Sequence, residues 1–583
     1  MLINMPVRWR KRGIVQFIHE SVRDFLVQSK GFQILDSTIG DNPIGVIQDQ
    51  MTRSCISYLA TVEELYTPTG SSSVLPGGSD KIEYLLRQYP LLRYTAKYMF
   101  AHASKADLEG ISQAHLVEDL QRPPYRGFDG FRACWRYFKE IDPLKCGDHP
   151  PSLMYAASKY NVFSCVSALL RAGESPNIRG GAGEYPLHVA SRNGHKAVVR
   201  LLLEHGAHID PGSPSHWTAL HYAANSGHYE VMEVLLDENA AINAKVFYGS
   251  TALHIAIESH HEHIIRLLLN RGADIEANST GGQTPLHCAA WSVPDDVRLI
   301  QLILDNGANI TAVTEEGETV LHLAARSRKV ESANFLLERG ADINIRTLDG
   351  ETVLHEAFRG YELLFNREAY SMAESSEELR LQKELILLLL EKGLDIETAA
   401  NNGERPLHVA AKLGFPGVVQ FALENNANVN TKTHDGSTAL HIAISCDNCE
   451  HSPPRPPLES IKQVEEMVQV LLRGGADVSA RNRFGETALH FASDRRLESI
   501  IWILMENGAD IDARDIDALP AVNKEWLIEL WGGLRRPHSG PRPKYRRDHD
   551  TGCRNYHASD MTSLSESPYP PWTSSIDRYD LSY

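Results

Sequence analysis

The stretch Thr251-Ala-Leu-His-Ile-Ala256 returns, with small changes, eight more times along the chain. Every copy contains a Leu-His pair, and the histidines of these pairs are His188, His221, His254, His287, His322, His355, His408, His441 and His490. Their successive spacings are 33, 33, 33, 35, 33, 53, 33 and 49 residues. A nearly fixed period indicates one supersecondary unit copied many times, rather than a row of catalytic bases or metal ligands.

Each part of the repeated phrase suits the start or end of a helix. Thr is a good N-cap, and Pro suits the first helical position because it has no N–H to leave unpaired. Gly194 and Gly227 can adopt positive φ where a first helix ends. The apolar pair Val199 and Leu202 has the spacing of a second helix that faces a neighbour. The sequence therefore predicts a turn followed by two antiparallel helices, with histidines that hydrogen-bond the start of a helix to its neighbours.

The phrase resembles the T-P-L-H-x-A signature of the ankyrin repeat, most closely at Thr284-Pro-Leu-His-Cys-Ala-Ala290. Ser152-Leu-Met-Tyr-Ala-Ala157 resembles a further unit, because Tyr155 stands one period before His188. The resemblance implies an all-α solenoid of about ten helix-turn-helix units across residues 149–518. It also implies that turn tips and first-helix residues form a concave face for a protein partner.

Two spacings exceed the period and predict insertions. The 53-residue gap places about 20 extra residues near 360–383, and the 49-residue gap places about 16 near 446–462. Both fall between the two helices of a unit, where extra chain can loop outward without interrupting the stack. They are either partner-specific loops or neutral insertions.

Residues 1–148 lack the repeat and are predicted to form a mostly helical module. Within them, Val15-Gln-Phe-Ile-His-Glu-Ser-Val-Arg-Asp-Phe-Leu26 and Tyr89-Pro-Leu-Leu-Arg-Tyr-Thr-Ala-Lys-Tyr-Met-Phe-Ala-His102 resemble winged-helix and helical segments. Such segments follow the NACHT domain in fungal NLR-like (STAND) proteins with C-terminal ankyrin repeats. A phosphate loop of the form G-x-x-x-x-G-K-[ST] does not occur in the sequence, so ATP binding is not expected. Residues 519–583 are predicted to contain a capping helix at Trp526–Trp531 and a disordered tail with a basic stretch.

Composition excludes several classes of function. The 583 residues carry a net charge of −17, which opposes attraction to nucleic acid or to an anionic membrane. The sequence has no apolar run of about 18 residues and no signal peptide at its N-terminus. Eight scattered cysteines indicate a reduced, intracellular protein, with the cytoplasm favoured over the nucleus.

Three kinds of reactive centre were considered and set aside. His-Glu occurs at His19, His261 and His355, but Arg23, Ile265 and Arg359 stand where H-E-x-x-H requires its second histidine. Cys446-Asp-Asn-Cys-Glu-His451 has metal-like spacing, but it supplies three ligands where a structural zinc site normally has four. A G-x-S-x-G nucleophile elbow is also absent. We therefore expect no catalytic residue, no metal, no cofactor and no small-molecule substrate.

These observations favour a non-catalytic protein-protein interaction scaffold or sensor. The alternatives are a truncated part of a NACHT-type nucleotide-driven switch and a substrate adaptor for a ubiquitin ligase. The predicted partner-binding residues are aromatic in three consecutive units and acidic in the next two: Trp217, Phe247, Tyr248, Trp291, Glu315, Glu316, Glu318, Asp349 and Glu351. The aromatic residues would anchor the partner side by side on the concave face, unless each packs against its own turn. The acidic residues would form a rim that steers a basic partner.

Overall fold

The computed structural model describes residues 42–64, 92–121, 152–180, 183–292, 294–360, 376–445 and 458–522. The chain divides into two units, Met1–Ser279 and Thr280–Tyr583, and each is described by itself. Within the described ranges the secondary structure is helical apart from two isolated bridges, Val313–Thr319 and Arg514–Pro520. The predicted all-α class is therefore confirmed.

The first unit begins with helices that cover one end of its stack of repeats. These helices are α3 (Pro43–Glu64), α5 (Leu92–Leu108) and α6 (His115–Gln121), and both α5 and α6 contact α9 (Phe163–Arg171). Asp107 accepts a hydrogen bond of 2.9 Å from the backbone N–H of Ser164 in the first turn of α9. The N–H of Gln113 donates to the Ser164 hydroxyl at 2.7 Å. The three helices thus shield the terminal face that a repeat stack must cover.

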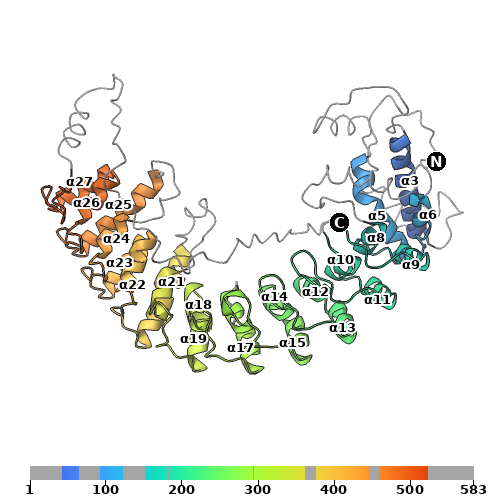
Figure 1. Ribbon diagram of the computed structural model, residues 1–583, viewed down its shortest axis with the longest axis horizontal. Coiled ribbons are helices and arrows are strands. Elements are labelled where there is room, and N and C mark those ends of the chain that lie inside the picture. The colour runs from blue at the N-terminus through green and yellow to red at the C-terminus, as the bar shows by residue number, and fades with distance from the viewer. Residues whose placement is uncertain are drawn as a thin grey trace, which may run out of the picture. The chain divides into compact units, whose positions relative to one another are not determined.

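Four helix pairs follow in the first unit. Their first helices are α8 (Leu153–Lys159), α10 (Pro186–Arg192), α12 (Ala219–Ser226) and α14 (Ala252–Glu258). Their second helices are α9, α11 (Lys196–Glu204), α13 (Tyr229–Asp237) and α15 (Glu262–Asn270). First helices contact first helices and second helices contact second helices, so the unit has two layers (Figure 1).

The second unit contains six helix pairs, which form two layers of their own. After η2 (Thr280–Gly282), the pairs are α16 (Pro285–Trp291) with α17 (Val297–Asp305), α18 (Val320–Arg326) with α19 (Val330–Glu338), α20 (Val353–Arg359) with α21 (Ser376–Glu391), α22 (Pro406–Leu413) with α23 (Pro416–Glu424), α24 (Ala439–Ser445) with α25 (Leu458–Arg473), and α26 (Ala488–Asp494) with α27 (Glu498–Glu506). The pairs of the two units together match the predicted number of repeats. Where the spacing is long, α21 and α25 have 16 residues, against 9 in α19 and α23. Part of the extra sequence therefore lengthens the second helix.

The repeated histidines have the structural role that the sequence predicts. The backbone N–H of Thr218 donates to Nδ1 of His221 at 3.1 Å, so Nδ1 carries no proton. The proton is therefore on Nε2, which donates to the carbonyl oxygen of Ala244 at 3.0 Å. Burial lowers the pKa of His221 to about 4, which keeps the ring neutral. The pKa falls to about 4 for the same reason at His188, His287, His322, His355 and His441.

A second contact ties four of the repeats to the one before, through His195, His228, His261 and Lys329. Gly194 ends α10 with φ +75°, and a Cβ there would lie 2.6 Å from Nδ1 of His228. Nε2 of His228 in turn lies 2.9 Å from the carbonyl oxygen of Arg192. In the second unit the buried Lys329 takes the place of such a histidine, and its Nζ donates to the carbonyl oxygens of Ser292 and Pro294. Both side chains satisfy carbonyl groups that the end of a first helix leaves unpaired.

Candidate interaction surfaces

Each repeat begins with a tight turn, and we call its residue with positive φ the apex. The apex residues are Gly183, His216, Gly249, Gly282, Gly317, Gly350, Gly403, Gly436, Gly485 and, after α27, Ala518. The two residues before an apex are here called tip residues, and the row of tip residues within one unit is called a ridge. Glycine is the default apex because it adopts positive φ without strain. At Gly317 a Cβ would also lie 3.0 Å from the backbone nitrogen of Leu348.

Backbone hydrogen bonds join successive tips. In the first unit, the N–H of Phe247 donates to the carbonyl oxygen of Ser215 at 3.2 Å. In the second unit, Leu348 donates to Glu316 at 2.9 Å, and Asn401 donates to Asp349 at 2.8 Å. Each bond occupies the same register position, so the ridge has fixed backbone and variable side chains.

The apex divides the predicted binding residues into two sets. Tip residues point outward: Phe247 is 69% exposed and Tyr248 36% exposed. The tip residues Glu315, Glu316 and Asp349 are exposed as well. Residues directly after an apex pack inward instead: Trp217 is half-buried, Glu318 is 5% exposed, and Glu351 is held in an ion pair. Their role in binding a partner stays a prediction, but only the tip residues are presented as exposed side chains.

The aromatic tip of the first unit is built from two repeats. The ring of Phe247 lies 6.3 Å from the ring of the apex residue His216, with 26° between the ring planes. Tyr248 meets Phe247 edge to face at 5.2 Å. Trp217 packs on Tyr222 of α12 at 5.1 Å. Trp217 is thus partly committed to its own repeat, whereas Phe247 extends from the ridge.

Trp291 belongs to the second unit. It is the last residue of α16 and is 38% exposed. Its predicted place beside the aromatic residues of the first unit stays a prediction.

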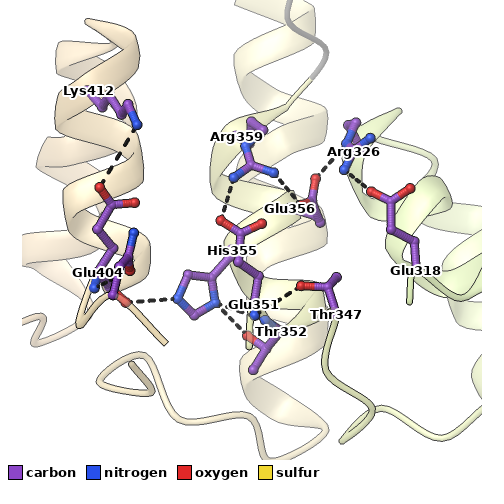
Figure 2. Close-up of polar contacts among 11 residues, drawn as sticks. Glu318, Arg326, Thr347, Glu351, Thr352, His355, Glu356, Arg359, Glu404 and Lys412 are labelled. Carbon is purple, nitrogen blue, oxygen red and sulfur yellow. Dashed lines mark hydrogen bonds and ion pairs between the residues drawn. The ribbon is translucent and has the colours of Figure 1, made fainter. Parts of the chain in front are cut away.

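A chain of charged side chains crosses the first-helix layer of the second unit (Figure 2). At its centre, Glu356 of α20 is completely buried. One of its oxygens lies 2.6 Å from Nε of Arg326, and the other lies 2.5 Å from Nη1 of Arg359. Arg326 also pairs with Glu318, and Nη2 of Arg359 lies 2.5 Å from Glu351. The network therefore joins two neighbouring repeats through three carboxylates and two guanidinium groups.

The carboxylates of this network differ in their protonation. Burial raises the pKa of Glu318 and of Glu351, although each pairs with one guanidinium group. Burial would also raise the pKa of Glu356, but Arg326 and Arg359 on its two sides outweigh it and lower that pKa. Glu356 is therefore the carboxylate that is held firmly anionic.

The first unit contains a counterpart built at the same register. Glu184 follows the apex Gly183 and pairs with Arg192 at the end of α10. Its carboxylate also accepts hydrogen bonds from the hydroxyl groups of Tyr155 at 2.9 Å and Tyr222 at 2.8 Å. The guanidinium group of Arg192 lies 4.1 Å from the centroid of the Tyr222 ring.

Sequence reasoning missed these networks, although two signals were present. A Glu after the apex is followed eight residues later by Arg or Lys in four repeats, at Glu184–Arg192, Glu318–Arg326, Glu351–Arg359 and Glu404–Lys412. The residue after the repeated histidine is Glu356 in one repeat, whereas the others have Val189, Tyr222, Ile255, Cys288, Leu323, Val409, Ile442 and Phe491. A charged residue at a position that is otherwise apolar or aromatic indicates a buried ion pair. The apex His216, where most repeats have glycine, was also visible in the sequence.

Neither a metal site nor a membrane span is found among the described residues. Among these residues there is no group of three or more His, Cys, Asp or Glu that could hold a metal ion. The Cys446–His451 cluster, Val15–Leu26 and Trp526–Trp531 lie outside the described residues. In the described part of the chain, no helix has both the length and the apolar character of a membrane span.

Two family models match the chain. The first, ankyrin repeats (3 copies), matches residues 153–246, 242–313, 294–368 and 377–452. The second, ankyrin repeat, matches residues 435–483 and 484–516. Together they cover more than half of the sequence and include both ridges.

Individual relatives match shorter stretches. The B-cell lymphoma 3 protein homolog of Mus musculus is 34% identical over 116 residues, which are 20% of this chain and 22% of the relative. Neurogenic locus notch homolog protein 1 of Xenopus laevis is 33% identical over 106 residues, which are 18% of this chain and 4% of the relative. The aligned part thus spans at most 22% of the length of either relative. The crystal structure of the ankyrin repeat domain of Bcl-3 is 29% identical, covering 36% of this chain and 94% of that chain, with a TM-score of 0.32.

Proposed function

Because the chain belongs to the ankyrin repeat family, we propose that it is a non-catalytic scaffold that binds a protein partner along its ridges. The observation that supports this most is the contrast between side chain and backbone at the tips. Phe247 and Leu348 are 69% and 72% exposed, yet the backbone N–H of each is hydrogen-bonded to the preceding tip. Large apolar side chains held outward on a rigid backbone are favourable anchors for a partner, since little backbone freedom is lost on binding.

The charge of the second ridge supports a basic partner. Glu315, Glu316 and Asp349 are exposed. Arg326 and Arg359 pair with Glu318, Glu351 and Glu356, and Arg346 donates to the carbonyl oxygens of Gly350 and Ala399. The three tip carboxylates therefore remain as net negative charge on the surface. Such a rim accelerates association with a basic surface more than it raises affinity.

A NACHT-type switch, a ubiquitin-ligase adaptor and a cytoplasmic location remain predictions. Leu92–His102 lies within α5, as a helical segment after a NACHT domain would require, but this helix does not identify that family. A ubiquitin-ligase adaptor role and a cytoplasmic location rest on the sequence arguments alone.

Site-specific photo-crosslinking tests the proposed surface. A photoreactive phenylalanine at Phe247 or Leu348 is expected to crosslink a common partner in extracts. Matched controls are Tyr229 on α13 and Leu387 on α21, which are 38% and 41% exposed but lie on second helices. Crosslinking that is equal at tips and controls, or that occurs at the controls alone, would contradict the proposal.

Charge reversal tests the predicted rim. Glu315→Lys with Glu316→Lys is expected to slow association with the crosslinked partner, whereas Glu331→Lys with Glu338→Lys on α19 is not. All four residues are exposed, so folding should be unaffected. An equal effect of both pairs would show that only the net charge of the protein matters.

A further inference from the structure

The aromatic tip of the first unit leaves a large ring face open to solvent. The exposed ring of Phe247 is supported on one side by His216 and at its edge by Tyr248. His216 adopts φ +61° at an apex where most other repeats have glycine. Positive φ costs a non-glycine residue free energy, and such strain is concentrated at binding sites. The local structure thus holds an apolar ring outward at a cost to folding.

Three backbone N–H groups around this tip are already hydrogen-bonded within the protein. The N–H of Phe247 donates to Ser215, the N–H of Val246 donates to the carbonyl of Ser250 at 3.0 Å, and the N–H of Gly249 donates to the carbonyl of Val246 at 2.8 Å. A partner that added a β-strand would need such N–H groups to be unpaired. These paired groups favour recognition of the tip through its side chains.

The protein itself shows which side chain covers an aromatic tip. In the second unit, Arg483 and Phe484 are the tip residues before the apex Gly485, at the positions that Phe247 and Tyr248 occupy in the first. The guanidinium group of Arg483 lies 4.7 Å from the centroid of the Phe484 ring. No Arg or Lys is a tip residue in the repeats that contribute Phe247 and His216, since those tips read Phe247-Tyr248 and Pro214-Ser215.

The charges around this tip also favour an arginine side chain as its ligand. Residues 212–217 and 246–251 contain no Asp, Glu, Lys or Arg, and the adjoining Lys245 has its Nζ bound to the carbonyl oxygen of Asn278 at 2.7 Å. The net charge of −17 attracts cations at longer range. Aromatic ring faces carry negative potential, and a planar guanidinium group stacks on them better than an ammonium group does.

We propose that Phe247 and Tyr248 bind an arginine side chain of a basic partner segment, with His216 holding the Phe247 ring in place. This assignment rests on the proposed scaffold function and names the chemical group that the first ridge recognises. The contact of Arg483 with Phe484, whose ring stands at the position of Tyr248, is the example within the chain of an arginine on an aromatic tip.

Peptide binding to the full chain tests the assignment. The probes are fluorescent peptides of alternating glycine and arginine, with lysine or uncharged citrulline replacing arginine in matched peptides, followed by anisotropy. We expect the arginine peptide to bind best. Phe247→Ala should weaken that peptide by about three- to tenfold and remove the preference for arginine over lysine, whereas Phe247→Trp should strengthen it. Tyr229→Ala is the control for an exposed aromatic residue, and thermal melting checks that each variant is folded.

The possible results separate this inference from the proposed function. If Phe247→Ala changes nothing while Glu315→Lys with Glu316→Lys abolishes binding, the arginine site is wrong but a basic partner on the ridges remains. If a proline-rich neutral peptide competes at the tip and the arginine peptide does not, the occupant is wrong. If no ridge variant alters crosslinking to the partner or peptide binding, both proposals fail.

Discussion

Replacing Glu356 with Gln tests whether the buried charge network stabilises the second unit. The side chain is completely buried between Arg326 and Arg359, so Gln fits the same space. Its amide keeps one acceptor oxygen, but its NH₂ group then faces the donors of the other guanidinium group. One charge-assisted hydrogen bond, with a contribution of about 1.5–3 kcal/mol, is lost, and one buried negative charge disappears. Because each arginine keeps a second carboxylate, we expect a loss of about 3 kcal/mol.

The measurement is urea unfolding combined with hydrogen exchange, since a repeat stack can open locally. Protection should fall in α18 and α20 first and spread to their neighbours. The control is Glu377→Gln, which removes the same charge from the exposed pair of Glu377 with Arg380 and should have no measurable effect. A loss below about 1 kcal/mol, or an equal effect of the control, would refute the stabilising role.

The pH dependence gives an independent check of the same variant. The pKa of Glu356 is lowered on folding, so its stabilisation is present above its unfolded pKa and is lost as pH falls toward the folded value. The difference between wild type and Glu356→Gln should therefore be largest at neutral pH and shrink below the ordinary glutamate pKa of 4.5. His322 and His355, whose pKa the Glu356 carboxylate raises, contribute to the difference as well, whereas the histidines of distant repeats cancel from it.

Three further predictions concern the repeats and the flanks. The buried histidines have a pKa of about 4 in the folded protein and 6.5 in the unfolded chain, so their stabilisation of the fold is present above pH 6.5 and is lost as pH falls. By pH 5 each should lower the free energy of unfolding by about 2 kcal/mol, seen as a steep acid transition in circular dichroism. Full helicity at pH 4 would contradict this. Gly317→Ala should lower the melting temperature more than Gly340→Ala. Both glycines have positive φ, but only a Cβ at residue 317 would meet backbone atoms within 4 Å. Equal decreases would mean that the backbone strain of positive φ alone accounts for the destabilisation. The full chain should show no ATP binding by calorimetry, and micromolar affinity would overturn this.

The repeat fold could be predicted because its determinants are local and copied. Each Thr, Leu and His acts within the start of its own helix. Because the phrase occurs nine times, a substitution in one copy does not hide the pattern. The acceptor itself was not predicted: His188, His221 and His408 each reach a carbonyl oxygen 23 residues later. Helix lengths at the two long spacings could not be predicted, because nothing in the period says whether extra residues extend a helix or leave it.

The candidate site was only partly predictable, for a geometric reason. Counting along the repeat placed Glu316 and Glu318 in one acidic turn, and both are near the apex Gly317. The chain reverses at that apex, so Glu316 faces solvent while Glu318 faces Arg326. The side of the apex on which a residue lies decides whether its side chain is exposed or buried. The amino-acid composition of the turn does not indicate that side. The bridging role of Glu356 requires two arginines from different repeats, a contact that only the stacking supplies.

The tip-to-tip hydrogen bonds have a consequence for how such a protein can change over generations. Each tip contributes its N–H and carbonyl to the ridge, whereas its side chain contributes little to stability because it is exposed. The residue two before the apex is accordingly Phe247, Glu315, Leu348, Asn401, His434, Arg483 or Ile516, all with the same backbone bond. Mutation there can alter what is recognised without loss of folding, so selection can explore new partners along the ridge one position at a time.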